Sequence, residues 1–194
     1  SSDISGFSVS SAGDVNGDGL ADLIVGARGA DPNGETNAGS SYVVFGTTDT
    51  SAIELSAVAA GSGGFIINGE NQYDLSGYSV SSAGDVNADG LDDLIIGAYQ
   101  ADGGGYGSGE SYLITAADLA AADAADGLSD GVVDLGSIAS QPGSYRFIGA
   151  NAGDLSGSSV ASAGDVDGDG PVALSAHLGS ESTLVTDLQL GGGR

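Results

Sequence analysis

The chain has 194 residues, with 36 Gly, no Cys, and 27 acidic residues against three basic ones, for a formal net charge of -24. A surface this negative repels phosphate groups, which excludes nucleic acids and anionic membrane surfaces as partners. The lack of Cys excludes disulfides and thiolate metal sites, and no apolar run is long enough for a transmembrane segment.

Short segments rich in Val, Ile, Tyr and Phe, bounded by Gly, Asp, Asn and Ser, predict β-strands along the chain. They cover residues 7–12, 22–27, 40–46, 64–68, 78–83, 93–98, 110–115 and 144–148. The apolar run Leu23-Ile24-Val25 predicts a strand covered on both faces. Between the last two strands, the Ala-rich segment from Thr115 predicts a short helix over residues 115–127, with Thr115 as its N-cap.

A long internal repeat organises these strands. Residues 6–20 return almost unchanged as residues 77–91 and again as residues 157–170, and the marker residues Asp14, Asp85 and Asp165 are 71 and 80 residues apart. We divide the chain into repeat 1 (1–76), repeat 2 (77–156), the start of repeat 3 (157–170) and a divergent segment (171–194).

Four antiparallel strands in each repeat predict an all-β fold made of β-propeller blades. A single blade cannot bury both of its faces, so such units occur in arrays. Two full blades and part of a third do not close a ring. We expect the remaining blades to come from a longer parent chain, because the sequence begins within a repeat, with self-association as the alternative.

Each repeat contains an acidic loop of the form Asp-x-(Asn/Asp)-x-Asp-Gly, and in the first two repeats a further Asp follows at position nine. Oxygens at alternate positions of a tight loop converge on one point, and the Gly at position six permits the sharp turn. An all-oxygen site of six or seven ligands suits Ca²⁺ better than Mg²⁺. The candidate ligands are Asp14, Asn16, Asp18, the carbonyl of Leu20 and Asp22; Asp85, Asn87, Asp89, the carbonyl of Leu91 and Asp93; and Asp165, Asp167 and Asp169.

Alternative interpretations of these loops are weaker. An EF-hand needs Glu at position twelve, where this chain has Val25 and Ile96. A plain Asp-Gly turn explains one such loop but not three in register. The third loop is a weaker candidate because Ala173 occupies position nine. Another acidic cluster, formed by Asp123, Asp126 and Asp130, has no repeated ligand spacing, which favours a solvated loop.

The chain resembles the FG-GAP repeats of integrin α-chain propellers and their bacterial relatives. The resemblance covers residues 6–170 and is carried by Gly6-Phe7-Ser8-Val9, Gly77-Tyr78-Ser79-Val80, Asp14-Val15-Asn16-Gly17-Asp18-Gly19 and Asp22-Leu23-Ile24-Val25-Gly26-Ala27. It implies a seven-bladed propeller whose loops bind Ca²⁺ between the first two strands of a blade. The name-giving Gly-Ala-Pro is replaced by Gly26-Ala27-Arg28 and Gly97-Ala98-Tyr99.

No catalytic set is visible, because His177 is the sole His and the chain has no nucleophile-elbow motif. We therefore expect a non-catalytic, calcium-binding propeller segment of a secreted or cell-surface protein. It would act in adhesion or as an interaction scaffold for an extracellular protein or glycan. Millimolar external calcium would fill even weak sites. The alternatives are an accessory propeller module of a secreted, phospholipase-like hydrolase, and a polysaccharide-binding module that uses Tyr73, Tyr99 and Tyr106.

Overall fold

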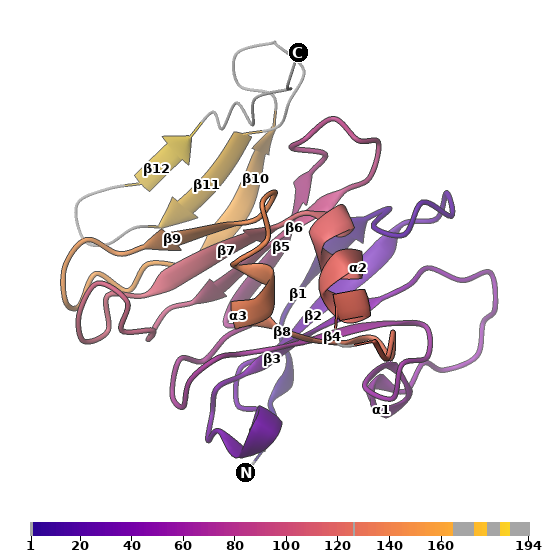
Figure 1. Ribbon diagram of the computed structural model, residues 1–194, viewed down its shortest axis with the longest axis horizontal. Helices are drawn as coiled ribbons and strands as arrows, with labels where there is room; N and C mark the ends of the chain where they lie inside the picture. Colours follow the sequence, from indigo (N-terminus) through magenta and orange to yellow (C-terminus); the bar gives the residue numbers. More distant parts are fainter. Residues whose placement is uncertain (1, 126, 165–172, 178–182, 187–194) are drawn as a thin grey trace.

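A computed structural model describes residues 2–125, 127–164, 173–177 and 183–186. Three β-sheets lie side by side in chain order, and each begins with the Ser-rich strand that opens a repeat. Figure 1 shows them as successive layers, from the first sheet in indigo to the third in yellow. The predicted all-β architecture of antiparallel blades is therefore confirmed, although the sheets do not close into a ring over the described residues.

Blade 1 is an antiparallel sheet of β1 (Ser5–Gly13), β2 (Asp22–Ala27), β3 (Ser40–Val44) and β4 (Gly64–Asn68), paired in that order. The connections carry a 3-10 turn, η1 (Pro32–Gly34), and a short helix, α1 (Leu55–Val58). The register between β1 and β2 shifts between Ser11 and Gly13, immediately before the first acidic loop. A bulge at this point redirects the chain into the loop.

Blade 2 repeats this order with β5 (Ser79–Gly84), β6 (Asp93–Ala98), β7 (Glu110–Ile114) and β9 (Tyr145–Ile148). Its register shifts in the same place, between Ser82 and Gly84. A third sheet contains β10 (Val160–Gly164), β11 (Ala173–His177) and β12 (Thr183–Thr186). Sequence comparison ends the repeat at residue 170, yet β11 pairs with β10 in the register that the earlier blades use, including the shift between Ser162 and Gly164.

The connection between β7 and β9 crosses back to blade 1. It contains α2 (Ala116–Ala125), β8 (Val132–Asp134) and α3 (Leu135–Ile138). Helix α2 lies within the segment where the sequence predicts a helix. Strand β8 pairs in parallel with β4, from Ile66–Val132 to Asn68–Asp134, and so adds a fifth strand to blade 1. We call residues 116–138 the strap, because they join the outer edge of blade 1 to blade 2 (Figure 1).

The main core lies between blades 1 and 2 and beneath the strap. It includes Ile24, Val43 and Ile67 of blade 1, Leu94, Ile96 and Tyr112 of blade 2, and Leu119, Leu135 and Ile138 of the strap. Burying one large apolar side chain contributes about 1.5–3 kcal/mol, so this cluster dominates the stability of the blade interface. A second cluster around Ile95, Leu113 and Val160 joins blades 2 and 3.

Glycine permits the close approach of neighbouring blades. A Cβ atom placed on Gly26 would lie 2.0 Å from the carbonyl oxygen of Gly77, and one on Gly97 would lie 1.9 Å from that of Gly157. Real Cβ atoms do not approach a carbonyl oxygen this closely, so both positions need Gly. This contact explains why Gly-Ala recurs at the end of the second strand of each full repeat.

No helix in the described ranges is both long enough and apolar enough to cross a membrane.

Candidate metal-binding loops

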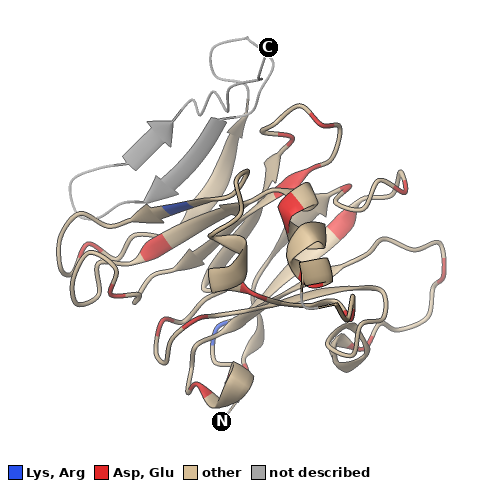
Figure 2. Cartoon of the chain, in the orientation of Figure 1, with Lys and Arg blue, Asp and Glu red and all other residues tan. Residues whose placement is uncertain are grey.

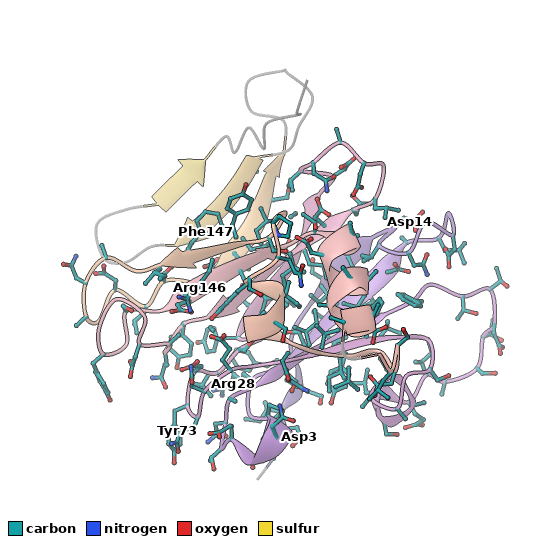
Figure 3. All side chains as sticks on the ribbon, in the orientation of Figure 1. Asp3, Asp14, Arg28, Tyr73, Arg146 and Phe147 are labelled. Atoms are coloured by element: carbon teal, nitrogen blue, oxygen red, sulfur yellow. The ribbon has the colours of Figure 1, made fainter. Side chains whose placement is uncertain are left out.

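The two complete acidic loops occupy equivalent places in consecutive blades. Residues 14–21 join β1 to β2, and residues 85–92 join β5 to β6. Because both pairs are antiparallel hairpins in neighbouring blades, the loops lie at the same end of the sheets. Figure 2 shows acidic residues spread over the loops of the molecule, and Figure 3 marks Asp14 in the first of these loops.

In the first loop, three side chains fold inward onto the loop backbone. The Asp14 carboxylate accepts hydrogen bonds from the N–H groups of positions four, five and six, at 2.8, 3.2 and 2.9 Å. The side-chain oxygen of Asn16 accepts from the N–H of Asp18 at 2.8 Å, and the Asp18 carboxylate accepts from the N–H of Leu20 at 2.8 Å. The Asn16 amide also donates to the Asp18 carboxylate at 3.0 Å, which places the side chains of positions three and five in direct contact.

The second loop reproduces this geometry. The Asp85 carboxylate accepts from positions five and six at 3.1 and 2.9 Å. The Asn87 side chain accepts from the N–H of Asp89 at 3.0 Å and donates to the Asp89 carboxylate at 2.9 Å. Gly19 and Gly90 at position six have φ angles of 85° and 91°, in the left-handed region. This is the conformation that the sharp turn of the motif requires.

The Asp at position nine has a different environment. Asp22 and Asp93 are buried, and each carboxylate accepts two backbone N–H groups. Asp22 accepts from Val15 at 2.9 Å and Gly46 at 2.7 Å, whereas Asp93 accepts at 2.9 Å from the N–H groups of residues 86 and 116. Burial raises the pKa of both carboxyls, that of Asp93 to about 7. This residue therefore fastens the base of the loop to the blade.

The donor set of the loops fits a hard divalent cation. Each loop gathers two carboxylates and one amide oxygen, with the carbonyl of Leu20 or Leu91 at position seven and a further carboxylate at the base. Ca²⁺ prefers such oxygen ligands. Over the described residues no three acidic or His side chains form a preassembled metal cluster, in keeping with position three being Asn. Each hydrogen-bonded carboxylate oxygen keeps a second lone pair for a ligand.

Asp92 joins the two loops, a role that the sequence analysis missed. Its carboxylate accepts a hydrogen bond from the N–H of Asp14 at 2.9 Å, and its own N–H donates to the Asp14 carbonyl at 3.0 Å. The equivalent residue of the first loop is Ala21. In the sequence, Asp92 stands next to the candidate ligand Asp93, but position eight is not part of the motif and is Asp in the second loop only.

The remaining acidic candidates are the residues of the third loop and the acidic cluster of the strap. Asp165, Asp167 and Asp169 of the third loop lie outside the described residues, as does Asp126. Asp123 and Asp130 each accept a backbone N–H nearby, from Gly131 at 2.7 Å and Val132 at 3.1 Å. These contacts give both carboxylates a local structural role in the strap.

A buried polar network in blade 2 was also missed. The Tyr112 hydroxyl donates to the buried Glu110 carboxylate and lies 3.3 Å from Glu70, while Arg146 lies 3.8 Å from both carboxylates. Burial raises the Tyr112 pKa, and the charge of Glu110 raises that of Arg146. The network ties β9 to β7 and to the chain after β4, as expected of a structural ion pair.

Comparisons with known proteins find the same two repeats in this chain. Residues 5–44 and 76–114 each match the FG-GAP repeat family, which confirms the resemblance stated above. The chain is also similar to an integrin alpha protein, Integrin alpha pat-2 of Caenorhabditis briggsae, with 33% identity over 101 residues. The match covers 49% of this chain and 7% of that protein, so the chain spans a small part of this relative's length.

Proposed function

The chain carries two FG-GAP repeats of the integrin α-like kind, and we propose that it is a calcium-binding, non-catalytic propeller segment of an extracellular or cell-surface protein. In that setting it acts in adhesion or as an interaction scaffold. The observation that carries the proposal is the repeated loop geometry. Two consecutive blades present the same inward-folded Asp, Asn and Asp side chains at the same end.

The residues that would hold the ion are those of the motif. In the first loop they are the side chains of positions one, three and five and the carbonyl of Leu20, with Asp22 at the base; the second loop offers the matching set ending in Asp93. Bound Ca²⁺ would supply positive charge to a chain whose net charge is -24. The ionised carboxylates of an empty loop repel one another, which destabilises the folded loop. Because Ca²⁺ would bind only the folded loop, its binding free energy would stabilise the fold.

The extracellular setting is supported by the family and by the chemistry. FG-GAP repeats and similarity to an integrin alpha protein accord with such a location. Sites of modest affinity are filled at external calcium concentrations of about a millimolar. The alternative of an accessory module in a secreted hydrolase shares these loops, and would be distinguished by a catalytic domain elsewhere in the parent protein.

The outer face of blade 1 supports the need for further blades. Val9 and Leu23, from the strands nearest the start of the chain, are 53% and 41% exposed. A propeller blade normally buries this face against its neighbour. We therefore assign this face to a neighbouring blade of a longer parent chain, with a second copy of this chain as the alternative.

Calorimetric titration with CaCl₂ tests the proposal. We expect the wild-type chain to bind at least two ions, and Asp18→Ala and Asp89→Ala, which remove the ligand oxygens, each to remove one. Glu35→Gln is the matched control, since it removes one exposed negative charge at the other end of blade 1. Chelation with EDTA should lower the melting temperature of the wild type. Absence of calcium heat, or equal stoichiometry in wild type and both loop variants, would refute the proposal.

A further inference from the structure

A hollow of about 630 Å³ opens at the end of the blades opposite the acidic loops. The connections at this end are those between β2 and β3, between β6 and β7, and from each blade to the next. The polar and aromatic side chains that line the hollow come from two of these connections: Gln72, Tyr73 and Asp74 precede β5, and Gln100, Asp102 and Tyr106 precede β7. Leu155, from the connection that precedes β10, completes the lining. In Figure 3, Asp14 and Tyr73 lie on opposite sides of the molecule.

Tyr73 is held in a conformation that its side chain does not favour. Its φ angle is 68°, and its N–H donates to the carbonyl of Thr36 at 2.9 Å. In the next repeat the equivalent residue is Gly153, with φ of 81° and the matching bond to the carbonyl of Tyr106 at 3.0 Å. The backbone thus needs a left-handed residue, for which Gly is the unstrained choice. Tyr73 is 55% exposed, so packing does not explain why a tyrosine stands here.

Tyr106 presents a second aromatic ring to the same hollow. Its side chain is 87% exposed, on a loop whose backbone is fixed on both sides. The N–H of Gly107 donates to the Asp102 carboxylate at 2.6 Å, and that of Gly109 donates to the carbonyl of Ala101 at 2.8 Å. The first repeat has Thr36 at this position. The loop therefore fixes the backbone that carries the exposed ring, which lowers the cost of ordering this segment on binding.

The polar side chains of the hollow are carboxylates and amides. Asp74 is only 6% exposed and accepts a hydrogen bond from the Asn71 amide at 3.2 Å, while Gln72 and Gln100 are exposed. No basic side chain is among the lining residues that the structure describes. Carboxylates accept hydrogen bonds and amides both accept and donate them. This set suits hydroxyl groups, and it disfavours anions.

We propose that this hollow binds a neutral saccharide, whose apolar C–H face stacks on Tyr73 and Tyr106 and whose hydroxyls bond to the carboxylates and amides. Aromatic walls with a few fixed polar groups are the usual lining of a small-molecule site. Tyr99 is not part of it, because its ring packs on Tyr78 with centroids 4.1 Å apart. The assignment goes beyond the calcium proposal, since the site shares no residue with the acidic loops.

Binding to an array of neutral oligosaccharides, followed by calorimetry of the best ligand, tests the assignment. Uronic-acid oligosaccharides and an Arg-rich peptide are tested beside them as competing ligand classes. The variants are Tyr106→Ala and Tyr73→Gly, the latter restoring the residue that the next repeat uses. Tyr145→Ser is the matched control, because Tyr145 is an exposed tyrosine on β9 outside the hollow.

We expect the wild type to retain at least one neutral oligosaccharide. Each hollow variant should weaken that binding about tenfold, the size of a lost aromatic contact, while Tyr145→Ser leaves it unchanged. Tyr73→Gly should melt at or above the wild-type temperature, which separates loss of binding from loss of folding. The assignment is overturned if no neutral oligosaccharide binds, if only the acidic sugars or the peptide bind, or if both hollow variants bind like the wild type.

Discussion

Replacing Asp92 tests whether the two acidic loops are mechanically joined. Asp92→Ala removes the carboxylate that accepts the Asp14 N–H at 2.9 Å, while the bond from the residue 92 N–H to the Asp14 carbonyl can persist. A hydrogen bond to a charged group contributes about 1.5–3 kcal/mol. Because Asp92 is only half-buried, solvent screening lowers this to about 1–2 kcal/mol. In a chain of this size that loss corresponds to a fall in Tm of about 2–8 °C.

Urea unfolding in EDTA measures this loss without metal. Asp92→Asn is the matched variant, because its amide oxygen can still accept the Asp14 N–H while the charge is gone. We expect Asp92→Asn to lose about half as much stability as Asp92→Ala. In calcium titrations, Asp92→Ala should lower the calcium affinity of the first loop more than that of the second, since the lost contact is to Asp14. Wild-type stability in Asp92→Ala, or equal losses in the two variants, would refute the proposed link.

Three further substitutions test the blade interface, the buried carboxyl and the strap. Gly97→Ala places a Cβ 1.9 Å from the Gly157 carbonyl oxygen and should cost about 3 kcal/mol or more in thermal unfolding; an unchanged midpoint would contradict the close contact. Burial raises the pKa of Asp74 to about 6, so its stabilising contribution is complete below about pH 4 and is lost as the pH rises through 6. Wild type should lose about 1–3 kcal/mol more than Asp74→Asn between pH 4 and 7, measured by urea unfolding at each pH, and parallel pH profiles would contradict this. Leu119→Ala removes a fully buried strap side chain and should cost about 2–5 kcal/mol; amide exchange in β4 should accelerate with it, and protection equal to wild type would show that the strap does not stabilise that edge.

Most of the blade structure was predictable because its signals are local. The apolar runs Leu23-Ile24-Val25 and Leu94-Ile95-Ile96, each between Asp and Gly, mark β2 and β6, and the predicted ranges 22–27 and 93–98 match the bounds Asp22–Ala27 and Asp93–Ala98. Strand β8 was not predictable, since Val132-Val133-Asp134 is too short to show a period and its partner β4 lies 66 residues earlier. Strand β11 was missed because Ala173–His177 lacks the consecutive apolar residues of its counterparts.

In the candidate site, too, the local features were predictable from the sequence and the tertiary contacts were not. Positions one, three and five of each loop all accept hydrogen bonds from the backbone of one short turn. This arrangement follows from the local spacing, while the role of these residues as metal ligands stays a prediction. The anchoring of Asp22 and Asp93 by N–H groups from beyond the loop depends on the tertiary fold. So does the placing of Tyr73 and Tyr106 in one hollow, since the two residues belong to different repeats.

Strand β8 limits where this chain can be truncated without exposing an edge of blade 1. A truncation after residue 76 would leave β4 without its parallel neighbour and would bare the side chains now covered by Leu119 and Ile138. Unpaired strand edges recruit other chains and promote aggregation. We therefore expect repeat 1 alone to aggregate, and dissection of this chain should keep repeat 1 joined to the strap.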